Sequence, residues 1–311
     1  MADAFDAAWF ADTFDAVRNW GRWGADDERG ALNLLTAERT AAAAALVRTG
    51  DTVSCALDLE TVPAADNPFP ADHHMLTAGD ARGENPLPGF EQSTDYFGVA
   101  CHGMAVSHID ALCHIFVDGH MYNGVPAHEV RSTGARRNSL RALNGGICGR
   151  GVLLDVPRVR GRDWIEPGDR ITPDDLEAAE REHGVTVEPG DVLLIATGRA
   201  RWRRAEGPGI ITKGLAGLHP TCIPWLRERD VAVLGSDAIS DAFGAGMVAN
   251  WPMPIHQCLI AAMGVHLLDN LDLATLGDAC AGHERWSFLL TIAPLRIPRA
   301  TGCPVNPIAV F

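Results

Sequence analysis

The chain has 311 residues, of which 47% are hydrophobic, and this is enough to bury a large core. Its formal net charge of −14 argues against binding to a nucleic-acid backbone, which needs clustered Lys and Arg. The longest nearly apolar run, residues 258–268, is about half the roughly 20 residues that a membrane helix needs. We therefore expect a globular protein with neither a nucleic-acid nor a membrane partner.

The N-terminal segment is acidic and lacks the basic start, apolar stretch and cleavage site of a secretory signal, so a cytoplasmic location is expected. Eight cysteines are scattered along the chain without a Cys-x-x-Cys pair. A chain of this size does not depend on disulfides, and the cysteines are predicted to be reduced and mostly buried.

The first third of the chain alternates between helical and irregular patterns. Residues 5–18 have apolar positions at helical spacing, and the aromatic segment 19–24 then forms a turn with two glycines. An alanine-rich helix is predicted from the cap at Thr36 to Gly50, followed by an alternating strand at 53–59. Residues 63–90, rich in Pro, Gly, Asp and Asn, are predicted to be a long loop of the kind that often forms a lid.

The rest of the chain mixes short buried strands with helices, without a strict βαβ rhythm, an internal repeat or a linker. This pattern predicts one α/β domain over residues 1–311 with a mixed, barrel-like sheet, and an N-terminal helical and aromatic arm over about residues 1–35. The predicted strands are 151–156, 192–197, 231–234 and 288–297, and the predicted helices are 172–184, 220–229 and 254–263.

The segment from His102 to His114 carries the strongest chemical signal. If residues 102–110 are extended, His102, His108 and Asp110 share one face, because strand side chains alternate. His108 and Asp110 can then bind one ion, whereas His102 needs a twist or a bulge to join them. Imidazole and carboxylate ligands together favour Zn, Mn or Fe over Ca or Mg.

His114 follows this segment and is a candidate general base or acid near neutral pH. The alternative for the whole cluster is a buried polar network that ties a strand to a loop. A metal site needs further ligands, and His256 and Asp269 are the best distant candidates. Both also have a simpler interpretation as caps of a helix or a strand.

Several segments resemble the cyclase family of metal-dependent hydrolases, which includes bacterial kynurenine formamidase and isatin hydrolase. His108-Ile-Asp110-Ala-Leu-Cys-His114 resembles the family's His-x-Asp-x-x-x-His core. The further segments that carry the resemblance are Asn19 to Gly24, Gly30 to Leu34, Tyr122 to Gly124, Gly235 to Asp237 with Ser240, His256, Asp269 to Leu271, and Gly302 to Val305.

The resemblance implies a swivelling β/β/α-type fold, with a central mixed barrel-like sheet surrounded by helices, in a homodimer or homotetramer. It also implies a divalent metal, Zn or Mn, and hydrolysis of an amide, formamide or lactam bond. His108, Asp110 and His256 would be metal ligands and His114 the catalytic base.

Two positions depart from the family pattern. Met104 stands where the family has its first histidine, and Asp269 replaces a longer glutamate. His102 could take the place of the missing ligand, or one ion could sit on a reduced ligand set. In a third alternative the site has lost its metal and works through His114, Asp110 and hydrogen-bond donors.

Six further residues are candidates for contact with a small-molecule substrate, and each has a structural alternative as a core ring, a pocket wall, a helix-entry residue or a loop anchor. They are Trp20, Trp23, Met104, Asp237, Ser240 and His219. The predicted function is hydrolysis of a C–N bond by metal-activated water. The substrate would be a small amide, formamide or lactam, with an aromatic ring as one option. The alternatives are a natural-product cyclase or dehydratase, and a non-catalytic binding protein with a degenerate metal site.

Overall fold

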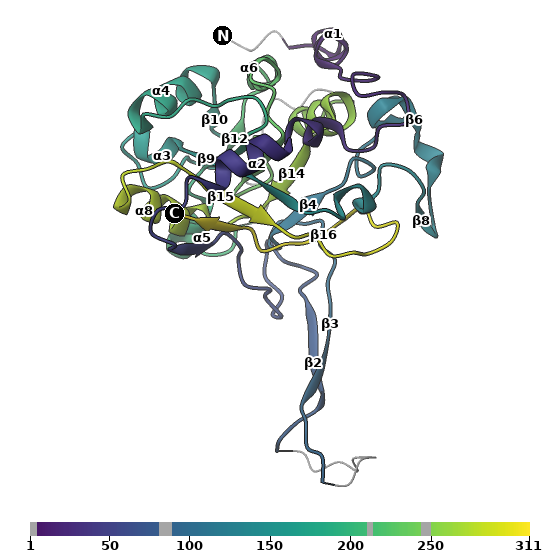
Figure 1. Ribbon diagram of the computed structural model, residues 1–311, viewed down its shortest axis with the longest axis vertical. Coiled ribbons are helices and arrows are strands. Elements are labelled where there is room, and N and C mark those ends of the chain that lie inside the picture. Colours follow the sequence, from purple (N-terminus) through teal and green to yellow (C-terminus); the bar gives the residue numbers. More distant parts are fainter. Residues whose placement is uncertain (1–4, 81–88, 210–213, 244–249) are drawn as a thin grey trace.

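The computed structural model describes residues 5–80, 89–209, 214–243 and 250–311. Its main feature is a nine-stranded sheet that curls into a half-barrel and is surrounded by helices (Figure 1). This architecture confirms the predicted α/β fold with a mixed, barrel-like sheet. In order across the sheet the strands are β1 (Thr52–Ser54), β17 (Ile308–Val310), β15 (Ser287–Ile292), β9 (Ile147–Asp155), β11 (Val192–Ala196), β13 (Val233–Ser236), β14 (His266–Asp269), β4 (His108–Asp110) and β16 (Gly302–Pro304).

The centre of the sheet is parallel and its two ends are antiparallel. The strands β9, β11, β13 and β14 run parallel, with Val192 opposite both Gly151 and Val233. All five residues of β11 are buried, as expected for a parallel strand that is covered on both faces. The short apolar runs in the sequence therefore become the core of the sheet.

The helices begin and end largely where capping residues predict. The helix α4 starts at a capping box of Thr172 and Asp175 and stops at Gly184, which has a φ of 60°. The α-helices are α1 (Ala7–Val17), α2 (Ala37–Ala44), α3 (Val156–Val159), α4 (Pro173–His183), α5 (Arg199–Glu206), α6 (Cys222–Glu228), α7 (Pro254–His256) and α8 (Leu273–Gly282).

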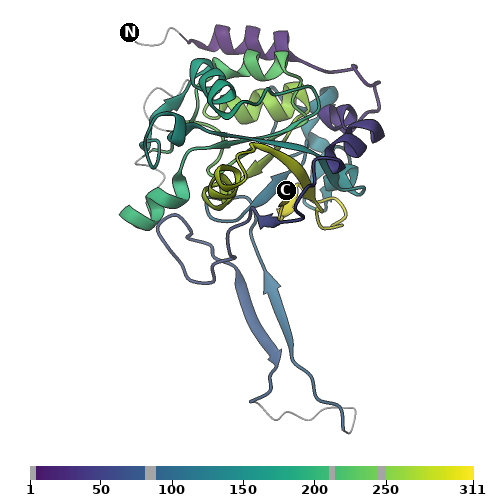
Figure 2. The same cartoon turned by 60° about the vertical axis from the view of Figure 1, so that its left-hand side comes forward.

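The helices form more than one layer around the sheet. The helix α2 packs on β9 and β15, and α8 packs on β1 and β11. The helix α7 continues as the π-helix η6 (Gln257–Met263), and α1 lies on α6 and η6 as an outer layer (Figure 2). In the described part of the chain, no helix is long and apolar enough to cross a bilayer.

Short elements complete the fold. The small strand pairs are β5 (His120–Met121) with β6 (Val125–Pro126), β7 (Val130–Arg131) with β8 (Gly134–Ala135), and β10 (Arg170–Ile171) with β12 (Gly217–Leu218). The 3-10 helices are η1 (Gly30–Leu34), η2 (Tyr122–Gly124), η3 (Ala127–Glu129) and η4 (Leu140–Leu143).

Three predicted elements are shorter than expected. The helix from Thr36 ends at Ala44 instead of Gly50. Of the strand predicted at 53–59, only the part within β1 (Thr52–Ser54) forms. The strand at 288–297 ends at Ile292, two residues before Pro294, which has no N–H to donate to a ladder.

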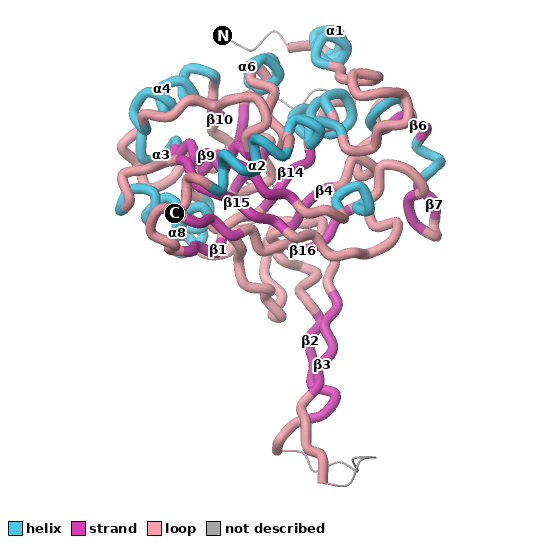
Figure 3. Tube along the Cα trace, viewed as in Figure 1, coloured by secondary structure: helices cyan, strands magenta, loops and turns pink. Residues whose placement is uncertain are grey.

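The predicted loop at 63–90 is wrong in part. Residues 72–77 form β2 (Asp72–Thr77), which pairs with β3 (Thr94–Gly98) in a hairpin. The hairpin projects from the body of the molecule and stands clear of the helices and the large sheet (Figure 3). Periodicity could not reveal it, because both faces of the hairpin are exposed and no polar–apolar alternation is required. Residues 81–88 of the predicted loop lie outside the described residues.

Candidate functional site

The strand β4 carries the centre of the candidate site and lies between β14 and β16. His108 is opposite Asp269 of β14, and Asp110 is opposite Gly302 of β16. Because the side chains alternate, His108 and Asp110 share one face, while Ile109 points into the core. This arrangement places one imidazole and two carboxylates, all buried, on neighbouring strands.

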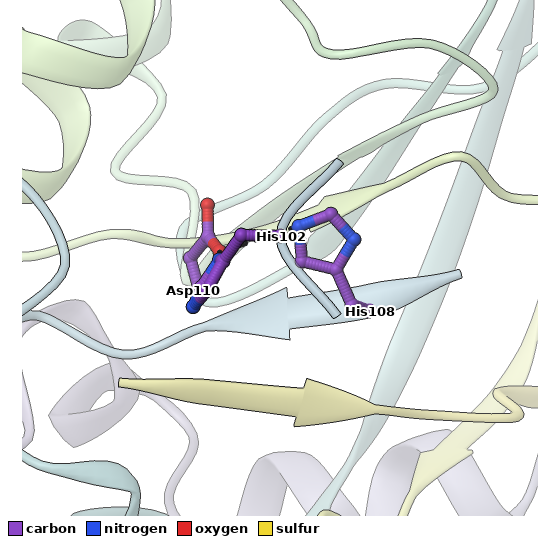
Figure 4. A group of neighbouring side chains, drawn as sticks. All are labelled: His102, His108 and Asp110. Carbon is purple, nitrogen blue, oxygen red and sulfur yellow. Dashed lines mark ion pairs between the residues drawn. The ribbon is translucent and has the colours of Figure 1, made fainter. Parts of the chain in front are cut away.

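His102, His108 and Asp110 form the first group of potential metal ligands, with one ligand atom from each within 4.8 Å of the others (Figure 4). His102 Nδ1 lies 2.9 Å from Asp110 Oδ1, and His108 Nε2 lies 3.4 Å from the same oxygen. The extended conformation that would place His102 on this face is not present over residues 102–107, since within residues 102–110 only His108–Asp110 is a strand. A bent loop instead returns His102 to Asp110.

Asn270 holds this loop in place. Its Nδ2 donates to the carbonyls of Gly103, at 2.7 Å, and Val106, at 3.1 Å. The Ser107 hydroxyl donates to the Asn270 carbonyl in return. Asn270 has a φ of 55°, a conformation that Asn tolerates better than most residues. The sequence indicated Asn270 only as part of a family signature, and its role as a clamp depends on contacts more than 160 residues apart.

Asp110, His256 and Asp269 form the second group of potential metal ligands. His256 Nε2 lies 3.2 Å from Asp269 Oδ2 and 3.8 Å from Asp110 Oδ2. Asp110 therefore belongs to both groups, with one oxygen facing His102 and His108 and the other facing His256. The structure thus brings all five predicted metal ligands together around this carboxylate.

Asp241 orients His256, and the sequence did not predict it as a site residue. His256 Nδ1 donates to Asp241 Oδ2 at 2.6 Å, and the backbone N–H groups of Ile255 and His256 donate to the same carboxylate. Its only signal in the sequence is its position directly after Ser240, at the end of a predicted strand segment.

The hydrogen bonds of the two buried histidines leave a ring nitrogen of each available to a metal. His108 Nδ1 donates to the Val106 carbonyl, as His256 Nδ1 does to Asp241, so both Nε2 atoms face the carboxylates. Among the described residues, Asp269 Oδ1 has no hydrogen-bond partner, and Asp110 Oδ1 faces only the ring nitrogens of His102 and His108. Oriented imidazoles and unsatisfied carboxylate oxygens are what a divalent ion requires, so these residues fit a metal.

The electrostatics of the cluster favour positive charge. Burial would lower the pKa of His102, but the Asp110 carboxylate beside it raises this pKa to about 10. Burial also opposes protonation of His256, yet Asp269 and Asp241 hold its pKa well above the ordinary value. Burial would raise the pKa of Asp110, and the imidazoles of His102 and His108 lower it well below its usual range. Protons or a divalent cation can supply this charge.

His114 lies directly beside the first ligand group. It follows β4 in a turn, and its ring stacks on His102 with 3.8 Å between the ring centroids. Burial lowers the pKa of His114 to about 4, and the neighbouring imidazoles of His102, His256 and His108 act in the same direction. His114 is therefore neutral near pH 7 and can accept a proton.

Met104 and Asp237 line a cleft of about 400 Å³ together with Ala105 and Arg199. The Arg199 guanidinium donates to the Met104 carbonyl at 2.9 Å, which connects the loop of His102 to α5. The Asp237 carboxylate accepts the N–H groups of Thr197, Gly198 and Arg199 at the start of α5. The carboxylate of Asp237 thus anchors a loop, one of the alternatives that the sequence left open.

The two tryptophans lie against the core. Trp20 donates through Nε1 to the Ala261 carbonyl of η6 at 2.8 Å, and its ring packs edge-on against Phe14. Trp23 lies under the guanidinium of Arg22, 4.7 Å from its ring centroid. Both rings are partly buried and pack against the core, and their role as a substrate shelf stays a prediction.

His219 and Ser240 are buried next to strand ends. His219 Nδ1 lies 2.7 Å from the Thr221 hydroxyl, and its ring meets Phe5 of the N-terminal arm. Ser240 has a φ of 59° and directly precedes Asp241. It is therefore part of the turn that positions the Asp241 carboxylate next to His256.

Comparison with known proteins identifies relatives over most of the chain. The Cyclase family model matches residues 39–241. A crystal structure described as a novel cyclase is 32% identical, with a TM-score of 0.85, and the match covers 94% of this chain and 99% of that one. A comparison with curated proteins found no match.

Two more distant structures share the fold. Isatin hydrolase A from Labrenzia aggregata, bound to benzyl benzoate, is 22% identical with a TM-score of 0.59, covering 86% of this chain and 94% of its own. A predicted metal-dependent hydrolase from Bacillus stearothermophilus is 15% identical with a TM-score of 0.52, covering 84% and 98%. The family match, the close structural relative and the geometry of the site agree, and the chain belongs to the Cyclase family.

Proposed function

We propose that the protein is a metal-dependent hydrolase that opens the C–N bond of a small cyclic or linear amide. The observation that carries the proposal is the pair of ligand groups that share Asp110, with a neutral His114 beside them. The likeness to isatin hydrolase supports a lactam as substrate, and the predicted metal-dependent hydrolase with the same fold supports a metal.

The first group would hold the metal through His102, His108 and Asp110, and the second through Asp110, His256 and Asp269. His102 takes the role that Met104 cannot fill, because a thioether is a poor ligand for the proposed Zn or Mn. A divalent ion bound there would polarise the amide carbonyl and lower the pKa of a bound water.

The proton chemistry falls to His114. As a neutral imidazole at the edge of the cluster it can accept the proton of the attacking water and return it to the leaving nitrogen. The imidazoles of His102 and His108 beside Oδ1 hold the pKa of Asp110 well below its usual range, so Asp110 remains ionised and keeps its negative charge for the cation. Asp241 keeps the Nε2 atom of His256 turned toward Asp269 and Asp110.

The test combines metal analysis with turnover. Protein purified without chelators should contain stoichiometric Zn or Mn and should open isatin or a related lactam, and chelation should remove the activity until metal is restored. His114→Ala should keep its metal and lose activity by about 10²- to 10⁴-fold. Full activity without stoichiometric metal would overturn the metal role, and a metal-loaded protein that opens no lactam or amide would overturn the reaction.

A further inference from the structure

The cleft of about 400 Å³ lies between α5, the loop of Met104 and the segment that follows β1. Its volume is within the range of small-molecule sites, about 300–1,000 Å³. One part of its wall is apolar and is formed by Leu57, Met104, Ala105 and Ala200. The other part is charged and includes the buried side chain of Arg199. The cleft thus combines apolar surface with a buried polar group, as ligand sites do.

The cleft and the two groups of potential metal ligands lie at the same edge of the sheet. Asp237 lines the cleft and directly follows β13, and Asp269 ends β14, the neighbouring parallel strand about 4.8 Å away. Ligands of open α/β sheets bind at this edge, outside the carboxyl ends of the strands. Met104, which lines the cleft, follows His102 by two residues. Since consecutive Cα atoms are about 3.8 Å apart, a molecule on the order of 10 Å long can reach both places.

Arg199 has donors left over after its contacts within the protein. Its side chain is 9% exposed, and Nη2 donates to the Asp66 carboxylate at 3.3 Å and to the Met104 carbonyl at 2.9 Å. Among the described residues, no acceptor meets its Nε or Nη1. A buried donor without an acceptor costs free energy, which an acceptor on a ligand would recover.

The cleft is the side of Arg199 with room for a ligand. Arg199 also borders a second cavity, but this cavity measures only about 20 Å³ and holds about one water. A ligand larger than water therefore meets the guanidinium from the cleft.

The charges around the cleft favour a neutral acceptor over an anion. Three guanidinium groups and three carboxylates line it, those of Arg199, Arg203, Arg204, Asp58, Glu60 and Asp237. Asp66 accepts from both Arg199 and Arg203 and adds one further negative charge. A carboxylate ligand would meet this excess of negative charge, whereas the oxygen of a neutral carbonyl accepts a hydrogen bond without adding to it.

We propose that the cleft is a second substrate subsite, in which Arg199 donates a hydrogen bond to a neutral carbonyl of the substrate, remote from the scissile amide. This inference rests on the hydrolase proposed above and narrows its substrate class. The substrate is a small molecule with an apolar body and two carbonyl groups on the order of 10 Å apart. The metal-ligand groups hold the amide, Arg199 holds the remote carbonyl, and Leu57, Met104 and Ala200 contact the apolar body.

Binding can be tested without turnover. The probes are 4-phenylbutyramide, which is neutral, and its charged analogues 4-phenylbutyrate and 4-phenylbutylamine, titrated by ligand-observed NMR. The neutral amide should bind at least about tenfold more tightly than either analogue, since only it suits the charge balance of the cleft. The carboxylate is compared after treatment with a chelator, because a bound metal would attract it. Equal affinities, or a preference for a charged analogue, would overturn the proposal.

Three variants locate the bound amide. Arg199→Met removes the donor and Ala200→Trp fills the cleft, and each should weaken binding of 4-phenylbutyramide by about tenfold or more. The matched control is Arg201→Gln on the same helix, because Arg201 pairs with Asp278 and does not line the cleft. It should leave the affinity unchanged.

Arg199 also supports the loop of Met104, so Ala200→Trp decides the question if Arg199→Met does not fold. Unchanged affinity in a folded Arg199→Met contradicts the role of the guanidinium. Unchanged affinity in Ala200→Trp contradicts the cleft as the site.

Turnover then links the cleft to the reaction. Formanilide and its 4-(3-carbamoylpropyl) derivative share a scissile formamide, and only the derivative has a second carbonyl on the order of 10 Å away. The KM of the derivative should be at least about tenfold lower than that of formanilide in the wild type and equal to it in Arg199→Met, with kcat little changed. Equal KM values in the wild type would overturn the subsite. If neither compound is hydrolysed, the proposed reaction fails, and the binding experiment still decides the role of the cleft.

Discussion

Asp241 belongs to neither group of candidate metal ligands, yet it orients one of them, His256. Its carboxylate accepts the Nδ1–H of His256 and two backbone N–H groups, and this fixes the ring before any ion arrives. Asp241→Asn removes the negative charge behind the imidazole and leaves the shape almost unchanged. We expect the affinity for the proposed divalent metal, Zn or Mn, to fall by about 10- to 100-fold, measured by competition with a chromophoric chelator.

The control for this experiment is the same exchange at a helix cap. Asp6→Asn at the start of α1 keeps an acceptor for the Trp9 N–H, and it should leave metal affinity unchanged. Thermal unfolding of both variants checks that the fold is intact. Equal metal affinity in Asp241→Asn and wild type would show that His256 does not depend on this carboxylate.

Asp191 should make the stability of the protein depend on pH. Burial raises the pKa of this carboxyl from 3.8 to about 6. Between these values the folded chain holds a proton that the unfolded chain has released, so stability falls as the pH rises from about 4 to about 6. The loss is on the order of 3 kcal/mol, at about 1.4 kcal/mol for each pKa unit.

Asp191→Asn removes this titration. Denaturant unfolding at pH 4 and pH 7 should show that the wild type loses more stability than the variant over this interval. Parallel stability profiles for the two proteins would contradict the assignment.

The residues of the site were predictable to different degrees. His108, Asp110 and His114 lie within seven residues, so one local pattern indicates all three. His102 was selected by strand alternation, but the structure brings it to Asp110 through a bent loop. Asp241 could not be recognised, because its role depends on contact with His256 on a different element.

At the level of elements, the N-terminal arm is attached to η6 through two glycines in direct contact. Gly30 and Gly264 both have positive φ, and the Ala31 N–H donates to the Gly264 carbonyl at 2.8 Å. A Cβ on Gly30 would lie 2.0 Å from the Gly264 carbonyl oxygen. The two backbones therefore have no room for any other residue at position 30.

Gly30→Ala should destabilise the protein by at least about 3 kcal/mol, because rigid backbone faces the new methyl group. Gly21→Ala is the matched control, since Gly21 also has a positive φ but nothing lies within 4 Å of its Cβ position. The control should cost only about 1 kcal/mol, from backbone strain alone. Denaturant unfolding of both variants checks the difference, and equal losses would contradict the close contact.

Elements were predictable where local chemistry decides them. The capping box at Thr172 and Asp175 and the buried run of β11 gave correct assignments. The sequence predicts an ordinary helix where the structure has the π-helix η6. Its apolar side chains are buried on all sides, so the hydrophobic pattern has no periodicity that could distinguish the two kinds of helix. The hairpin of β2 and β3 was missed, because neither strand has a face directed to the core of its own chain.

For the whole molecule, the sequence predicted the class of fold but not the order of the strands. Both neighbours of β4 come from more than 150 residues later in the chain, and β1 pairs with β17. Hydrophobic patterns report which segments are buried, and they contain no information about which strands pair. The convergence of β4, β14 and β16 on Asp110 is therefore a property of the structure alone.

Removal of residues 308–311 tests how far the sheet depends on its last strand. β17 fills the space between β1 and β15, and Phe311 is fully buried against Phe288. We expect the shortened chain to lose its cooperative thermal transition, measured by near-UV circular dichroism, although every candidate ligand is still present. An unchanged melting temperature would contradict this dependence.

The pairing of β4 with β16 also sets the order of events during synthesis. The segment with His108 and Asp110 leaves the ribosome nearly 200 residues before Gly302–Pro304 emerges to cover its open edge. Until then the strand has an unpaired edge and no finished pocket, a situation in which chains tend to associate wrongly. A nascent chain of this protein should therefore need protection by chaperones until Gly302–Pro304 has emerged, and the proposed metal should bind only after that point.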